Sequence, residues 1–253
     1  MADMILRAEG ICKKYKRPTK TESHFEAVKP LDFLMQKGKM AAIYGRSGSG
    51  KSSLLYMMAG LLKPNSGRVF AEGFDDFARI RGGETKNSGA AAESGEEKID
   101  LYALDDERLS RFRNKHFGVI PQGQTGLYSL TVLQNVLVPA CIYKESGADE
   151  KKAKELLELV GIGRLSSARM NELSGGEMRR MAVARALVSD CDFIFADEPT
   201  DDLDDENTKI VLALLRKIAD SGKAVLLVSH ESSAKNYADE VYRMNSGSIT
   251  RES

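Results

Sequence analysis

The feature that most constrains this chain is a glycine-rich segment between a predicted strand and a predicted helix. The apolar run at residues 40–44 is typical of a buried strand, and the segment from Gly45 to Ser52 follows it directly. Apolar side chains then recur at helical spacing over residues 54–62, and turn residues at 63–67 end that helix. A turn in this position presents backbone N–H groups at the positive end of a helix, which favours an anion.

The same segment predicts that the anion is the phosphate chain of a nucleotide. It fits the pattern G-x-x-x-x-G-K-[ST] at every fixed position. We expect Lys51 to reach the β- and γ-phosphates and the Ser52 hydroxyl to ligate Mg²⁺. A glycine- and serine-rich turn with no ligand is the alternative, and the flanking strand and helix argue against it. The residues expected to contact the nucleotide here are Gly45, Arg46, Ser47, Gly48, Ser49, Gly50, Lys51, Ser52 and Ser53.

Two adjacent carboxylates follow a second apolar run. Residues 192–196 predict a strand that delivers Asp197 and Glu198 to its carboxyl end, where α/β folds bind ligands. Asp197 is suited to hold the Mg²⁺ shell, and Glu198 to act as the general base for water attacking the γ-phosphate. A solvated acidic turn before Pro199 is the alternative, and its weight falls once the glycine-rich segment is present.

A second potential anion-binding turn lies at Ser174, Gly175 and Gly176. These residues open a predicted helix, so the chain has two helix N-termini that could bind phosphate. A kinase or a small GTPase needs only one. If each turn completes the nucleotide site of another copy of the chain, the two turns fit a two-fold dimer. Taken alone, the turn is equally well explained as a helix cap.

With these segments the chain resembles the nucleotide-binding domains of ABC transporters, over nearly its whole length outside residues 81–98. The glycine-rich segment, LSGGE at residues 173–177 and FIFADE at residues 193–198 occur in the order of that family. Its Q-loop, D-loop and H-loop residues are matched by Gln122, Asp204 and His230.

The resemblance implies roles for residues that their local pattern does not explain. Gln122 would contact Mg²⁺ or the attacking water and couple the site to a permease, and His230 would hydrogen-bond the γ-phosphate. Tyr15 matches the aromatic residue that stacks on adenine. The segment Ser174–Gly176 and Asp204 would contribute to the nucleotide site at the dimer interface.

Within the family the chain looks most like the ATPases of lipoprotein release, macrolide export and cell division. The residues after Gln122 and the sequence LTVLQNV at 130–136 carry this similarity. The chain also departs from the family pattern. Arg46 stands where proline is common and Glu177 where glutamine is common. The loop around Gln122 is unusual because of Pro121, Gly123, Thr125 and Gly126.

Strand and helix patterns that alternate along the chain predict an α/β fold. We expect one domain over residues 1–253, with a parallel sheet, an antiparallel β portion near the N-terminus and a helical subdomain at about 123–178. Residues 81–98 contain no Leu, Val or aromatic residue, so we expect a disordered insertion there.

Composition excludes some partners and leaves others. The 37 basic and 37 acidic residues balance, which argues against nucleic acid. Three widely spaced cysteines fit a reducing compartment, and no run is long and apolar enough to span a membrane. We therefore expect a cytoplasmic ATPase that binds ATP and Mg²⁺, pairs with a second ATPase subunit and lies at the membrane through a separate permease. The alternative is a soluble ABC-type ATPase that acts on a non-transport partner.

Overall fold

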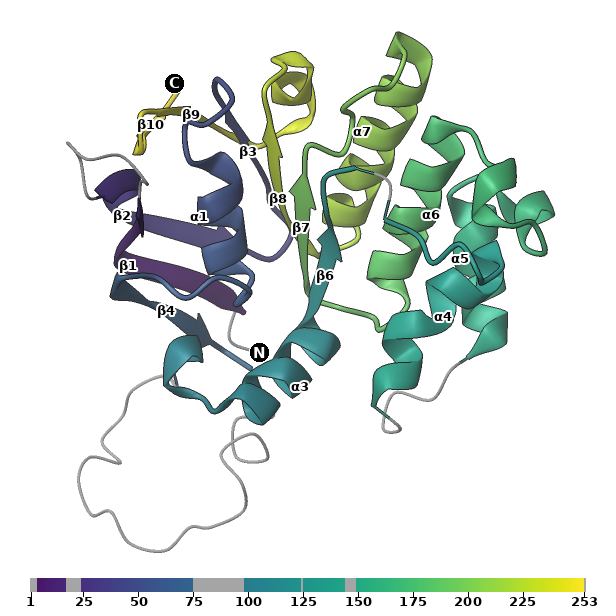
Figure 1. Ribbon diagram of the computed structural model, residues 1–253, viewed down its shortest axis with the longest axis horizontal. Coiled ribbons are helices and arrows are strands. Elements are labelled where there is room, and N and C mark those ends of the chain that lie inside the picture. Colours follow the sequence, from purple (N-terminus) through teal and green to yellow (C-terminus); the bar gives the residue numbers. More distant parts are fainter. Residues whose placement is uncertain (1–3, 17–23, 75–97, 124, 144–148, 253) are drawn as a thin grey trace, which may run out of the picture.

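The computed structural model describes residues 4–16, 24–74, 98–123, 125–143 and 149–252, which form two sheets flanked by helices (Figure 1). The larger sheet has six strands, and all neighbouring strands in it are parallel except β10 and β9. The expected parallel sheet is therefore confirmed. In spatial order its strands are β10 (Ser248–Arg251), β9 (Glu240–Asn245), β3 (Met40–Tyr44), β8 (Ala224–Ser229), β7 (Phe193–Asp197) and β6 (Phe117–Ile120).

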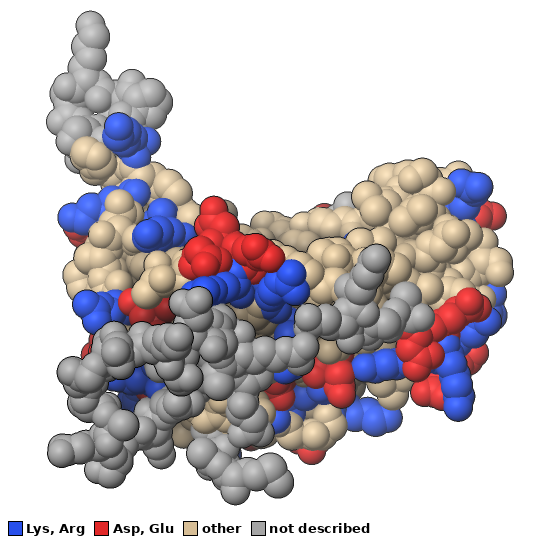
Figure 2. Space-filling view, turned by 90° about the horizontal axis from the view of Figure 1, so that it is seen from below, with Lys and Arg blue, Asp and Glu red and all other residues tan. Residues whose placement is uncertain are grey.

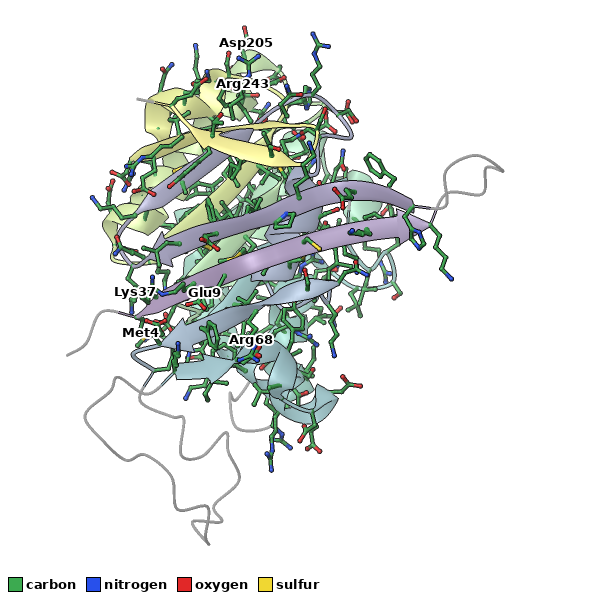
Figure 3. All side chains as sticks on the ribbon, turned by 90° about the vertical axis from the view of Figure 1, so that its left-hand side faces the viewer. Met4, Glu9, Lys37, Arg68, Asp205 and Arg243 are labelled. Atoms are coloured by element: carbon green, nitrogen blue, oxygen red, sulfur yellow. The ribbon has the colours of Figure 1, made fainter. Side chains whose placement is uncertain are left out.

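The second sheet is antiparallel and comes mainly from the N-terminal part of the chain, as expected. Its long central strand β1 pairs with β2 on one side and with β4 on the other (Figure 3). Bulges near residues 9–12 interrupt the register of both pairs. In spatial order the strands are β2 (His24–Gln36), β1 (Ile5–Lys16), β4 (Ser66–Glu72) and β5 (Lys98–Asp100).

Successive side chains of a strand point to opposite faces, so the apolar residues of the parallel sheet are divided between two cores. In β7, Phe193 and Phe195 face the core shared with α1 and the antiparallel sheet, whereas Ile194 and Ala196 face the helices on the other side. Because both faces are covered, the strand reads as a continuous apolar run. In Figure 1, helix α1 lies between the two sheets, and α4, α5, α6 and α7 lie on the opposite side of the parallel sheet.

Most of the helices begin at a residue whose side chain accepts a hydrogen bond from the first helical turn. Asp105, Thr131, Asp149, Ser174 and Asp204 do so for α3, α4, α5, α6 and α7. The helices are α1 (Lys51–Met58), α3 (Asp106–His116), α4 (Val132–Ile142), α5 (Glu150–Leu159), α6 (Gly175–Leu187) and α7 (Asp205–Asp220).

Two of the expected segments lie partly outside the described residues. Residues 81–97 of the expected insertion lie outside them, and Lys98, which we included in it, begins β5. The expected helical subdomain contains α4, α5, two short 3₁₀ turns and the start of α6 among its described residues. No helix in the described ranges is both long and apolar enough to cross a membrane.

Candidate functional site

The glycine-rich loop is held in place by close backbone contacts that leave no room for larger side chains. A Cβ atom on Gly45 would lie 2.2 Å from the Met244 carbonyl oxygen. One on Gly50, which has a φ of +107°, would lie 2.0 Å from the Ala27 carbonyl oxygen. Gly247 in the β9–β10 turn donates to the Ser49 carbonyl at 3.0 Å. The two sheets therefore position the loop at the start of α1.

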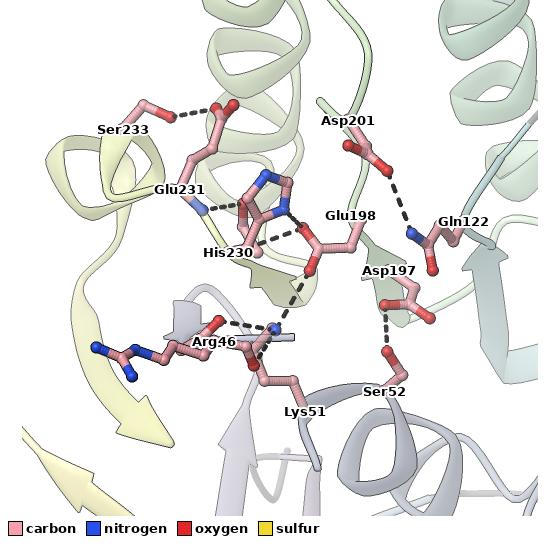
Figure 4. Close-up of polar contacts among 12 residues, drawn as sticks. Arg46, Lys51, Ser52, Gln122, Asp197, Glu198, Asp201, His230, Glu231 and Ser233 are labelled. Carbon is pink, nitrogen blue, oxygen red and sulfur yellow. Dashed lines mark hydrogen bonds and ion pairs between the residues drawn. The ribbon is translucent and has the colours of Figure 1, made fainter. Parts of the chain in front are cut away.

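Lys51 lies buried under this loop and bridges it to the carboxylate that follows β7. Its Nζ donates to the Gly45 carbonyl at 2.9 Å and lies 3.3 Å from Oε1 of Glu198 (Figure 4). The other carboxylate oxygen of Glu198 accepts from the backbone N–H of His230 and contacts His230 Nδ1, both at 2.9 Å. Glu198 has a positive φ of 46°, an uncommon conformation outside glycine. Lysine, glutamate and histidine from three separate segments of the chain thus converge.

The second carboxylate of the pair forms a group of oxygen atoms suited to a hard cation. Asp197 is 1% exposed at the end of β7, and its Oδ1 accepts from the Ser52 hydroxyl at 2.8 Å. Burial and a hydrogen bond with Asp197 raise the pKa of the Tyr56 hydroxyl, which therefore stays protonated beside the carboxylate. Carboxylate and hydroxyl oxygens are ligands that Mg²⁺ accepts.

The remaining predicted residues border the same region from other elements. Gln122 follows β6, and its side-chain amide donates to Asp201 at 3.2 Å. Tyr15, near the end of β1, is 41% exposed, and its hydroxyl lies 3.2 Å from the Ser53 hydroxyl. An aromatic ring thus lies next to the loop that would hold phosphates. The side chain of Arg46 points away from the Lys51–Glu198 pair (Figure 4).

The structure does not bring the Ser174–Gly176 turn to the glycine-rich loop of the same chain. The turn begins α6, and in Figure 1 the start of α6 lies well to the right of the loop that precedes α1. Ser174 caps α6 and exchanges hydrogen bonds with Glu177, which lower the pKa of that carboxyl. Asp204 likewise caps α7, accepting from the Asn207 N–H at 2.8 Å.

Sequence reasoning missed residues that connect these loops. Asn207 donates to both carboxylate oxygens of Asp204 and accepts from Arg180 at 3.0 Å. A Cβ on Gly176 would lie 2.3 Å from Asn207 Oδ1, so the start of α6 packs directly on this amide. The position of Asn207 three residues after a helix-capping aspartate was the available signal.

Comparison with known proteins supports one family. A family model described as ABC transporter matches residues 28–201. The chain is 34% identical over 252 residues to the lipoprotein-releasing system ATP-binding protein LolD of Aquifex aeolicus, covering 98% of this chain and 97% of that protein. It is 33% identical over 251 residues to the macrolide export ATP-binding/permease protein MacB of a Shewanella species, covering 98% of this chain and 34% of that protein.

A solved structure agrees with these relatives. It is a dimeric structure of a post-hydrolysis state of the ATP-binding cassette MJ0796 bound to ADP and Pi. The two chains are 28% identical with a TM-score of 0.79, and the match covers 98% of this chain and 97% of that one. The chain therefore belongs to the ABC transporter family, as an ATP-hydrolysing, ATP-binding subunit of the type that includes LolD and MacB.

Proposed function

We propose that two copies of the chain bind MgATP between them and that its hydrolysis drives a separate membrane permease of the lipoprotein-release or macrolide-export type. The proposal of a dimer rests on one observation: the two turns expected to bind phosphate lie apart within one chain. Ser174–Gly176 is ordered and capped, yet it lies away from the glycine-rich loop of its own chain. In a two-fold dimer it would face the loop of the partner, as both halves of such an interface do.

The chemistry assigned to the site is the in-line attack of water on the γ-phosphate. Lys51 would exchange its ion pair with Glu198 for one with the β- and γ-phosphates, because a triphosphate carries more negative charge than one carboxylate. Glu198, released from Lys51, would accept the proton of the attacking water. The backbone N–H of His230 would keep its hydrogen bond to Glu198, while the imidazole would donate a hydrogen bond to the γ-phosphate. ADP and phosphate are the products.

The residues present fit a magnesium ion bound with the substrate. Ser52 Oγ and Asp197 Oδ1 are 2.8 Å apart, and Gln122 lies at the end of the neighbouring strand β6. We assign these three as the residues that would hold the ion. Bound there, the ion would neutralise charge on the β- and γ-phosphate oxygens.

The proposed permease site is a groove between the sheet and the helical side of the molecule. Leu61 and Ile142 are 50% and 61% exposed there, beside the sheet residue Val119. Arg185, which also lines the groove, donates two hydrogen bonds to Thr125 in the loop after Gln122. Force on this groove would therefore reach the Gln122 loop. The occupant we propose is a cytoplasmic segment of the permease, since this chain matches 34% of MacB, which is an ATP-binding/permease protein.

Figure 2 views the face that is at the bottom in Figure 1, where α3 and the end of α4 lie. Acidic and basic side chains gather near the middle of this face, and a broad surface without charge extends to the upper right. Helix α3 contributes both signs, whereas α4 contains no charged residue. A surface without charged side chains, bordered by charged ones, suits a protein partner.

The test uses a tagged chain expressed in its own organism and recovered from detergent-solubilised membranes. Ile142→Glu places a charge in the groove, and Leu159→Glu, at the 45% exposed end of α5, is the matched control. We expect the wild type and the control to retain a partner with membrane-spanning segments, identified by mass spectrometry, and Ile142→Glu to lose it without loss of isolated ATPase activity. Recovery of ribosomal or DNA-bound partners only would favour the soluble alternative.

A further inference from the structure

A buried arginine on α6 binds the loop that carries Gln122. Arg179 is 6% exposed, and its Nη1 donates to the carbonyl oxygens of Pro121 at 3.2 Å and Gly123 at 3.1 Å. Its Nη2 lies 3.5 Å from the Asp201 carbonyl. All three acceptors belong to the backbone. The planar guanidinium therefore recognises the path of the chain rather than a particular side chain.

The three residues that supply these carbonyl groups are also neighbours of Gln122. Pro121 and Gly123 flank it in the sequence, and Asp201 accepts its side-chain amide. Gly123 has a φ of +80°, a conformation that favours glycine. Pro121 and Gly123 are also residues at which this loop departs from the family pattern, so the departure and the arginine contact coincide.

The burial of Arg179 makes these bonds costly to break. Burial lowers the pKa of the guanidinium, and the nearby acidic residues Asp201, Asp202 and Asp197 oppose that change. Since arginine remains protonated in proteins, displacing the loop from α6 would leave a buried charge without its acceptors. The loop and α6 are therefore expected to move together.

The next residue of α6, Arg180, contacts the first turn of α7. Arg180 donates to Asn207, which donates to Asp204. Arg179 thus binds the Gln122 loop directly, and Arg180 is linked to Asp204 through Asn207 in the first turn of α7.

We propose that Arg179 is a positioning residue for hydrolysis: it fastens the Gln122 loop to the helix that bears the Ser174–Gly176 turn. Gln122 then reaches the magnesium ion and the attacking water only when α6 is correctly placed against the partner's nucleotide. This proposal rests on the proposed role of Gln122 and on the shared nucleotide site.

The test compares the purified chains carrying Arg179→Gln, Arg179→Lys and Gln122→Ala, and the double variant Arg179→Gln/Gln122→Ala. A misplaced loop should lower kcat by about 10- to 100-fold while the ATP dissociation constant changes by less than about twofold. Arg179→Lys keeps the positive charge but loses the planar guanidinium with its several donors, so it should lower kcat by less. This variant also provides the test if Arg179→Gln folds poorly. Because Arg179 acts through Gln122, its substitution in the Gln122→Ala background should add little.

Arg216→Gln is the matched control, because Arg216 also donates to a backbone carbonyl, that of Tyr237, but at the far end of α7. It should leave kcat unchanged. If both Arg179 variants keep normal kcat, or if their loss multiplies fully with that of Gln122→Ala, Arg179 is structural and the inference is wrong. If Gln122→Ala itself hydrolyses ATP normally, the assigned role of Gln122 fails and the inference fails with it.

Discussion

At the scale of single residues, Lys51 shows how the site is prepared for an anion. Its side chain is 5% exposed, and its ammonium group is paired with Glu198, which is also buried. A buried charge is stable only with such a partner. In the proposed complex the phosphates of ATP would take over this pairing, so Lys51 would have an anionic partner both without and with nucleotide.

Lys51→Ala is expected to weaken ATP binding by about 10- to 100-fold, because charge-assisted hydrogen bonds contribute roughly 1.5–3 kcal/mol. The measurement is titration of the purified chain with a fluorescent ATP analogue. Lys223→Ala is the control, since Lys223 pairs with Asp190 away from the site. Unchanged affinity in Lys51→Ala would remove the nucleotide from the glycine-rich loop.

Residues with a local motif could be predicted, whereas residues defined by distant backbone could not. Lys51, Ser52 and Asp197 stand in fixed patterns, and the structure brings them together. Arg179 donates to carbonyls 56 and 58 positions earlier in the chain. No side-chain pattern records such a contact, because any residue supplies a carbonyl group.

At the scale of elements, buried strands and capped helices were predictable and the strands at sheet margins were less so. The expected strand at 40–44 coincides with β3, and the expected strand at 192–196 overlaps β7. We did not predict β9 and β10. Their two-residue turn, Ser246 and Gly247, has positive φ at both positions, and the Asn-Ser-Gly sequence was the signal we missed.

Asp192 joins three elements at the edge of the sheet opposite to the nucleotide site. Its oxygens lie 2.8 Å from Nζ of Lys37 and 2.8 Å from Nδ1 of His116. Burial alone would raise the pKa of Asp192, but the hydrogen bonds from His116 and Lys37 outweigh it and hold the pKa at about 2. The folded state therefore favours the charged carboxylate.

Asp192→Asn should lower the free energy of unfolding by about 2 kcal/mol at neutral pH. A depressed pKa stabilises the fold above the unfolded value of about 4, and this contribution is lost as the pH falls towards about 2. The difference between wild type and variant should therefore shrink in urea unfolding below about pH 4. Asp190→Asn is the control, because Asp190 is 76% exposed and its pair should contribute little. A difference that is constant with pH would contradict the assignment.

At the scale of the whole molecule, the proposed nucleotide site is divided between two parts of one chain. In the proposed dimer the glycine-rich loop, Asp197 and Glu198 would form one half, and the Ser174–Gly176 turn of the partner would form the other. Within each chain, Arg179 and Arg180 connect α6, which begins with that turn, to the Gln122 loop and to Asn207 at the start of α7. Closure of two chains over ATP would therefore also set the position of Gln122 in each.

The most direct test of this account is the mass of the Glu198→Gln variant in solution, measured by light scattering at high protein concentration with and without MgATP. The amide cannot act as a base, so turnover should stop while ATP stays bound. We expect a dimer with MgATP and a monomer without it. Adding Ser174→Asp keeps a helix cap but sets a negative charge against the partner's phosphates, and should restore the monomer. A nucleotide-bound Glu198→Gln chain that remains monomeric, or a dimer indifferent to Ser174→Asp, would contradict the shared site.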